Sequence, residues 1–310
     1  MRRAFATVIA LLVVAAGCAV APTYTASNST FEGFPVISYV PAHPAGVVFA
    51  FHGTGGGADF ATRLETVDML NHLVAAGYGF VSTESTDRTT KQWNTSSLSL
   101  TTNPDLARLS RLWASLQANG SVTDQMPIYA IGMSRGAGFA SVFAQAFENA
   151  GYHVAAIAPS HGQIPVSVRA NGGLTVPTFF TLGANDELVD NEQTVAQVAD
   201  LVAHGVPASC TIEPETNLNA SRFLRVPGID TPTANAIFGA LVTAGLFDAS
   251  GHRLVSVAAV AAGLPSVVLP ANVTKAQKRM VQDEVAVVIA VHQYSATYAA
   301  QTVTFFGAHH

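Results

Sequence analysis

Short apolar runs alternate with longer segments of helical periodicity along this chain. Runs of four to eight mostly apolar residues are typical of buried strands, and they predict strands at residues 46–51, 80–82, 128–131, 153–158, 176–182 and 209–213. In the segments between them apolar residues recur every three or four positions, which predicts helices at 59–76, 103–118 and 192–203. The alternation predicts an α/β fold, a mostly parallel central sheet with helices on both faces.

The two ends of the body differ from this regular core. Residues 23–30 are interpreted as a linker and residues 34–41 as an edge strand. Residues 216–290 form a longer connection than a strand and a helix need, and they predict helices at 231–246 and 274–290. We interpret this segment as a helical cap inserted before a last helix at 294–306; the alternative is a decoration packed on the flank. The body, 22–310, is then one domain.

The first 21 residues predict export. A basic head, Met1-Arg2-Arg3, precedes an apolar stretch at 4–16 that is too short for a comfortable membrane span. The sequence ending Gly17-Cys18 favours a bacterial lipoprotein signal with a lipid on Cys18. The alternative is cleavage after Ala21 and ordinary secretion. Both place the protein outside the cytoplasm, in the cell envelope or beyond it.

Composition narrows the set of partners. Charged residues make up 11% of the 310 residues, the formal net charge is −5, and there is no basic run, which argues against nucleic acid as a partner. A lipid on Cys18 is the only membrane contact predicted. Cys210 is the one other cysteine, so no disulfide is expected within the body and we predict that this thiol is buried. No zinc-type spacing of His or Cys occurs, and neither a metal nor a cofactor is predicted.

The central motif is Gly132-Met-Ser-Arg-Gly136, which lies between a predicted strand and a helix. Such a turn places the serine in a strained backbone conformation with its hydroxyl exposed at the carboxyl end of the strand. It also directs the free N–H groups of the helix start at charge that develops on the substrate. We therefore predict that Ser134 is a nucleophile; the alternative is a surface serine in a strand–helix turn.

A second motif, His52-Gly-Thr-Gly-Gly-Gly57, directly follows the strand at 46–51. Glycines allow a close approach of the backbone to a substrate. A phosphate-binding loop would need a following Lys-Ser/Thr pair, which the sequence lacks. We predict an oxyanion hole formed by the backbone N–H of Arg135 and by that of Thr54 or Gly55.

The acid and the base are expected after the serine, in that order. Gly183-Ala-Asn-Asp186 ends an apolar strand and predicts Asp186 as the acid. Asp190 is the rival, although it also suits a helix cap, and Glu187 is a weaker alternative.

Five histidines follow Asp186. His292, just before the last predicted helix, is the predicted base, and His309 and His310 are the alternatives at the chain end. His204 and His252 have ordinary surface settings beside glycine.

Together these motifs resemble the α/β-hydrolases, and within them the secreted polyhydroxybutyrate depolymerase and feruloyl esterase-like group. Gln92-Trp93-Asn94 is similar to a tryptophan-containing loop of that group. The body departs from the group by having one cysteine and by the long segment at 216–290.

The resemblance implies a serine hydrolase that cleaves carboxylic esters through Ser134, Asp186 and His292. Trp93 and His161 are the candidate substrate contacts, and a hydrogen-bonded loop histidine is the other interpretation of His161. The substrate would be a small or polymeric ester. A peptidase or amidase of the same fold and a non-catalytic binding protein are the alternative functions.

Overall fold

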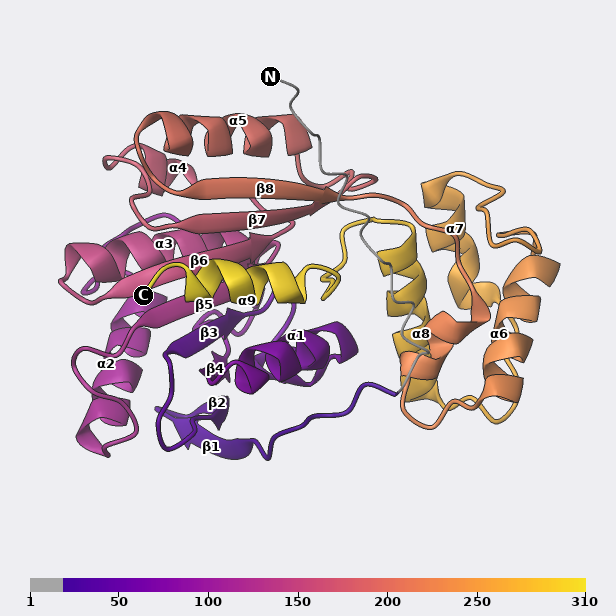
Figure 1. The fold of residues 1–310 in the computed structure, drawn as a ribbon, viewed down its shortest axis with the longest axis horizontal. Coiled ribbons are helices and arrows are strands. Elements are labelled where there is room, and N and C mark those ends of the chain that lie inside the picture. The colour runs from indigo at the N-terminus through magenta and orange to yellow at the C-terminus, as the bar shows by residue number, and fades with distance from the viewer. Residues whose placement is uncertain (1–18) are drawn as a thin grey trace, which may run out of the picture.

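The computed structural model describes residues 19–310, so most of the predicted export signal, with Cys18, lies outside the described residues. An eight-stranded sheet forms the centre, in the order β1-β2-β4-β3-β5-β6-β7-β8 (Figure 1). Strand β2 pairs antiparallel with both β1 and β4, and all the other neighbouring strands are parallel. The strands are β1 (Ser27–Phe31), β2 (Phe34–Tyr39), β3 (Val47–Phe51), β4 (Gly79–Thr83), β5 (Ile128–Met133), β6 (Val154–Ser160), β7 (Thr178–Gly183) and β8 (Ala208–Glu213).

Helices cover both faces of this sheet. One face packs against α2, α3, α4 and α5, and the other against α1 and α9. The α-helices are α1 (Leu64–Ala75), α2 (Pro104–Ala118), α3 (Arg135–Asn149), α4 (Val166–Arg169), α5 (Asn191–Ala203), α6 (Thr231–Thr243), α7 (Val257–Gly263), α8 (Lys275–Val288) and α9 (Ala299–Gly307). The 3-10 helices are η1 (Ala58–Thr62), η2 (Ala220–Arg225) and η3 (Leu264–Ser266).

The central strand β3 shows why its sequence is apolar throughout. Successive side chains of a strand point to opposite faces. Val47, Phe49 and Phe51 enter the core on the α3 side, whereas Val48 and Ala50 enter the core on the α1 side. All five are buried. The predicted α/β fold with a mostly parallel sheet is therefore confirmed.

Three predicted elements were wrong in part. Residues 23–30 are not all linker, because Ser27–Phe31 pairs with β2; as an edge strand with exposed side chains it lacks an apolar pattern. The helix predicted at 59–76 is broken at Arg63, whose backbone is extended between η1 and α1. The last helix begins at Ala299 instead of residue 294, and the preceding residues form an irregular segment. Cys210 is only half-buried, at the margin of the core.

The segment after β8 has a hydrophobic core of its own. Helices α6, α7 and α8 lie beside the carboxyl ends of the strands (Figure 1), and their apolar side chains form a third cluster that includes Leu64 of α1. The predicted helices at 231–246 and 274–290 correspond to α6 and α8, and α7 was not predicted. The interpretation of residues 216–290 as a cap stays a prediction. Within residues 19–310, no helix combines the length and apolar character needed to cross a bilayer.

A buried cluster of charges joins this segment to the sheet domain. Glu65 of α1 and Glu284 of α8 are both buried, and both pair with Arg222 and Arg225 of η2. Arg225 also lies 2.7 Å from Asp68. Removing one partner of a buried ion pair leaves the other charges uncompensated in a region of low dielectric constant, which is strongly destabilising. The cluster thus fixes α8 and η2 to α1.

We expect Arg225→Leu to lower the free energy of unfolding by about 3–5 kcal/mol, because Glu65, Asp68 and Glu284 would lose their shared cation. Denaturant unfolding would measure this loss. Arg111→Leu is the matched control, because Arg111 forms an exposed pair with Glu32, and such pairs contribute about 0–1 kcal/mol. Equal losses in the two variants would contradict the structural role of the cluster.

Candidate active site

Ser134 lies at the turn between β5 and α3 with a left-handed backbone, φ 58° and ψ −120°. The two glycines of the motif have a steric reason. A Cβ on Gly132 would lie 2.3 Å from the Gly136 carbonyl oxygen, and a Cβ on Gly136 would lie 2.3 Å from the Phe51 carbonyl oxygen. Any larger residue would push the turn away from β3. The G-x-S-x-G pattern is therefore the sequence requirement of this tight turn.

A chain of hydrogen bonds connects Ser134 to Asp186 through His292. The His292 Nε2 atom lies 2.8 Å from Ser134 Oγ, and His292 Nδ1 lies 2.8 Å from Asp186 Oδ2. The other carboxylate oxygen of Asp186 accepts from the N–H groups of Leu188 and Val189. Burial alone raises the pKa of a carboxyl, but the hydrogen bonds from His161, His292 and Leu188 outweigh burial and hold the pKa of Asp186 well below its usual range.

One short turn positions both Asp186 and His292. The Asn185 backbone N–H donates to the Ala290 carbonyl, and the Asn185 side chain donates to the Ile289 carbonyl, each at 2.9 Å. A Cβ on Gly183 would lie 2.4 Å from the Ala290 carbonyl oxygen, so the two segments are in direct backbone contact. The turn that ends in Asp186 therefore holds the residues that lead into His292.

Helix α8 ends in a tight reversal that places the Ile289 and Ala290 carbonyls at this contact. The Ala290 N–H donates to Val287 and the Val291 N–H donates to Ala286, which is the double hydrogen bond of a Schellman ending. Ala290 has φ 52° at the position that glycine usually occupies. The helix thus ends in a strained reversal two residues before His292, and backbone strain of this kind is concentrated at functional sites.

The irregular segment after His292 is held by carboxylates instead of by helical hydrogen bonds. Glu65 accepts from the Ala296 N–H at 2.6 Å. The Glu213 side chain accepts from the hydroxyls of Ser295 and Thr297. Burial raises the pKa of Glu213. These contacts fix the path of residues 293–298, which neither periodicity nor a helix start signal could have predicted.

Two backbone N–H groups near Ser134 have no acceptor in the described part of the chain. Arg135 is the first residue of α3, where the backbone N–H has no partner within the helix. Thr54 lies with Ser134 and His292 in one cavity wall. Of the two alternatives predicted for the second donor, Thr54 and Gly55, Gly55 is already engaged, because its N–H donates to the Lys91 carbonyl at 3.2 Å. The donors available for an oxyanion are thus Arg135 and Thr54.

Trp93 was predicted as a substrate contact, and the structure contradicts this, because its side chain is fully buried. Its indole N–H donates to the His52 carbonyl at 3.0 Å, and its own carbonyl accepts from the Arg135 side chain. The ring stacks on Phe139 of α3 at 4.6 Å. A buried indole needs a partner for its N–H, and here that partner is the start of the glycine loop. Trp93 therefore braces this loop against α3.

His52 supports the glycine loop from below. Its Nδ1 lies 2.7 Å from the Gly53 carbonyl, and its Nε2 accepts from the Ser85 N–H at 3.2 Å. Because Nε2 accepts, the proton is on Nδ1 and donates to Gly53. Burial lowers the pKa of His52 to about 4, so the ring stays neutral at physiological pH and keeps both hydrogen bonds.

His161, the other predicted substrate contact, lines a cavity together with Ser134 and His292. It is buried, with φ 51°, and its Nδ1 lies 2.8 Å from the same Asp186 oxygen that receives His292. Two imidazoles therefore share one carboxylate oxygen. The sequence placed His161 after β6 at the correct sheet edge, and the loop-histidine interpretation is the one this geometry matches. The Pro159-Ser-His-Gly turn was the available signal, but it could not identify Asp186 as the partner.

The remaining candidates lie away from Ser134. Asp190 caps α5 by accepting from the Gln193 N–H. His252 pairs with Asp248, and His204 pairs with Asp200 on the exposed end of α5. The carbonyl of His309 accepts from the Tyr129 hydroxyl.

His161, Asp186 and His292 are also the described residues grouped closely enough to hold a metal ion, with ligand atoms within 4.8 Å of one another. Their geometry is that of a hydrogen-bonded chain, because Asp186 lies at 2.8 Å from both Nδ1 atoms. A metal would have to displace these hydrogen bonds. The residues therefore fit proton transfer better than metal binding.

Two cavities meet at Ser134. One, of about 390 Å³, lies between the glycine loop and the inserted helices and is lined by Thr54, Arg63 and Asp283. The other, of about 750 Å³, lies along the loop that follows β6. Ser134, His292 and Leu188 line both cavities. Substrate groups on either side of a scissile bond at Ser134 would therefore have separate spaces.

No model of a protein family and no curated protein matches this sequence. Among solved structures, the chain is similar to DphMB1, with 19% identity and a TM-score of 0.46, over 72% of this chain and 84% of that chain. It is also similar to a carboxylesterase from Mesorhizobium loti, with 16% identity and a TM-score of 0.44, over 61% and 90% of the two chains. An acetyl xylan esterase from Aspergillus awamori matches at 14% identity and a TM-score of 0.43, over 58% and 81%.

Similarities this distant say nothing about the reaction. The sheet order and the strand–Ser134–helix turn are features of this chain itself. The chain has the α/β-hydrolase fold. In this fold, the polar residues of the site lie at the carboxyl ends of the strands, where ligands bind in open α/β sheets.

We expect His161→Ala to lower kcat/KM for an ester by roughly 10- to 100-fold, because a hydrogen bond to a charged group contributes about 1.5–3 kcal/mol. His161→Asn should restore part of the rate, because an asparagine side chain keeps an N–H donor for Asp186. Measuring kcat/KM for both variants tests this. Equal losses in the two variants would reduce His161 to a packing role.

Proposed function

We propose that this α/β-hydrolase cleaves carboxylic esters through a covalent acyl-enzyme on Ser134. The observation that carries the proposal is the connected chain Ser134–His292–Asp186, with both distances at 2.8 Å. The pattern of nucleophile, base and orienting acid is that of serine hydrolases on several folds. The resemblance of the serine turn and glycine loop to an esterase group favours an ester over an amide.

The geometry supports a two-step reaction. His292 Nε2 takes the hydroxyl proton of Ser134 while Oγ attacks the ester carbonyl carbon. The carbonyl oxygen becomes an oxyanion, for which the N–H groups of Arg135 and Thr54 are the available donors. Asp186 stabilises the imidazolium. His292 then gives its proton to the leaving alcohol, and the carbon–oxygen bond to that alcohol breaks.

The second step returns the enzyme to its starting state. A water molecule loses a proton to His292 and attacks the acyl carbon. The tetrahedral intermediate uses the same donors, and its collapse releases the acid and returns the proton to Ser134 Oγ. The two cavities at Ser134 would separate the acyl part from the alcohol part.

We expect Ser134→Ala to fold normally and to lower ester turnover by roughly 10⁴-fold or more, as removal of a triad member does in other serine hydrolases. The substrates are p-nitrophenyl esters of increasing acyl length, methyl ferulate and peptide p-nitroanilides. Ser141→Ala is the matched control, because Ser141 is buried seven residues further along α3.

The panel separates the alternatives. Turnover of p-nitroanilides above that of esters would favour a peptidase or amidase. No turnover of any substrate by the parent protein would favour a binding protein, and equal activity of Ser134→Ala would refute the nucleophile.

A further inference from the structure

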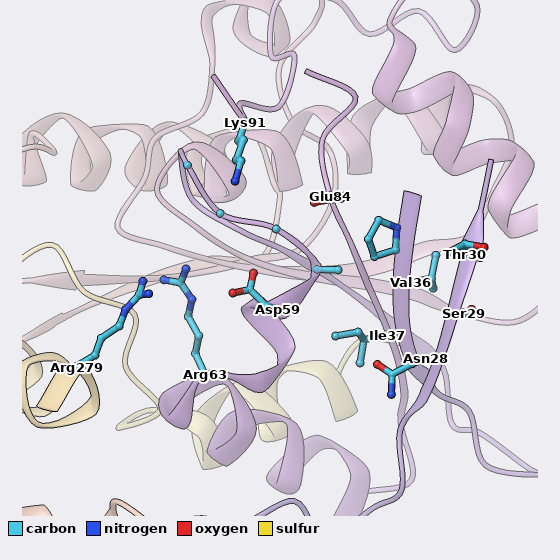
Figure 2. A pocket seen from close by; sticks show the side chains of 15 residues that line it. Asn28, Ser29, Thr30, Val36, Ile37, Asp59, Arg63, Glu84, Lys91 and Arg279 are labelled. Atoms are coloured by element: carbon cyan, nitrogen blue, oxygen red, sulfur yellow. The ribbon is translucent and has the colours of Figure 1, made fainter. Parts of the chain in front are cut away.

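A third hollow, a groove beside the glycine loop, adjoins the smaller of the two cavities at Ser134. It measures about 890 Å³ and lies between β1, β2 and residues 55–57 of that loop (Figure 2). Gly56 and Arg63 line both this groove and the cavity that contains Ser134 and His292. A substrate bound at Ser134 therefore has room to extend past Arg63 into the groove.

Three cationic side chains enter the groove from separate parts of the fold. Arg63 precedes α1, Lys91 follows β4, and Arg279 belongs to α8 of the inserted segment. In Figure 2 the guanidinium groups of Arg63 and Arg279 point to the same region, and Lys91 extends toward the groove from another wall. Among residues 19–310, none of the three has a carboxylate within ion-pair distance.

The acidic residues of the groove do not cancel this charge. Glu84 pairs with Arg88 at 2.5 Å, which leaves Asp59 as the unpaired carboxylate among the described lining residues. Asp283 lies on the catalytic side, and burial raises its pKa although Arg279 and Arg63 act in the opposite direction. The groove is thus locally cationic in a chain whose formal net charge is −5. Neighbouring cations repel one another, and a bound anion would offset that repulsion.

The wall that carries Lys91 is connected to the oxyanion loop. Lys91 has φ 52°, a conformation that is costly for a residue with a side chain. In this conformation its carbonyl accepts from the Gly55 N–H, while its side chain faces the groove. The strained conformation of Lys91 therefore allows its carbonyl to contact the glycine loop while its side chain lines the groove.

We propose that this groove binds an oxyanion, a carboxylate or a phosphate, that the ester substrate carries at a distance from its scissile bond. The proposal rests on the proposed ester hydrolysis and adds a substrate class to it. Planar guanidinium groups bind carboxylate and phosphate oxygens in pairs, which gives orientation as well as attraction. Because Arg279 belongs to the inserted segment, that segment takes part in substrate selection.

The kinetic test compares esters that differ in charge at the far end of the acyl chain. p-Nitrophenyl butyrate is neutral, mono-p-nitrophenyl glutarate carries a carboxylate, and the p-nitrophenyl ester of 4-phosphonobutyrate carries a phosphonate in place of phosphate. The parent should have a higher kcat/KM for an anionic ester than for the neutral ester. The anionic ester with the higher value shows whether the groove prefers a carboxylate or a phosphate-like group. Arg279→Gln should lower the ratio of anionic to neutral kcat/KM by about tenfold, the equivalent of one charge-assisted hydrogen bond.

Lys275→Gln is the matched control, since it removes the same charge one helical turn earlier on α8 and does not line the groove. It should keep the parent's preference. No preference of the parent for either anionic ester, or equal effects of Arg279→Gln and Lys275→Gln, would overturn the anion site.

A binding measurement keeps this inference separate from the proposed reaction. Calorimetry with Ser134→Ala would compare monomethyl glutarate with dimethyl glutarate. The anionic ester should bind more tightly, and adding Arg279→Gln should weaken its binding about tenfold. Anion-selective binding without ester turnover in the parent would refute the hydrolase and leave the anion site standing. Equal binding of the two esters would overturn the anion site even if the enzyme hydrolyses esters.

Discussion

The contact between the turn at 183–186 and the end of α8 is the constraint on which the candidate site depends. Asp186 and His292 are 106 residues apart, and the chain between them leaves the sheet to form a segment with its own core. The two backbone segments meet because Gly183 has no side chain and because Asn185 donates to the carbonyls of Ile289 and Ala290. Without that contact, His292 would have no fixed position relative to β7.

The buried charges extend this constraint over a larger part of the molecule. Glu65 connects three parts, since it pairs with Arg222 and Arg225 of η2 and accepts from the Ala296 N–H. The inserted helices, α1 and the irregular segment after His292 are thereby joined through one carboxylate. This arrangement explains why a segment with its own hydrophobic core can still hold His292 within hydrogen-bond distance of Ser134.

Local patterns predicted the parts of this fold that depend on neighbouring residues. The strand, the glycines and the helix around Ser134 lie within a few residues of one another. The tight turn requires glycine at 132 and 136, and this requirement is visible as the G-x-S-x-G motif. Contacts that depend on distant residues left no such pattern. Trp93 was predicted as a substrate contact from a local resemblance. The sequence could not show that the ring is buried, because that burial depends on Phe139 of the distant helix α3. The Gly55 N–H was predicted as a possible oxyanion donor because its hydrogen bond to the strained Lys91 backbone could not be foreseen. The hydrogen bonds of His161 and His292 to one oxygen of Asp186 could not be foreseen either.

The central claim is that the irregular segment 289–298 places His292 beside Ser134. His309 and His310 at the chain end do not take that position. The most direct measurement is the rate at which a fluorophosphonate labels Ser134, followed by mass spectrometry. His292→Ala should slow labelling by roughly 10³- to 10⁴-fold. The double variant His309→Ala/His310→Ala should label at the parent's rate, since it keeps the His309 carbonyl that receives Tyr129. Parent-like labelling of His292→Ala, with loss in the double variant, would contradict the account.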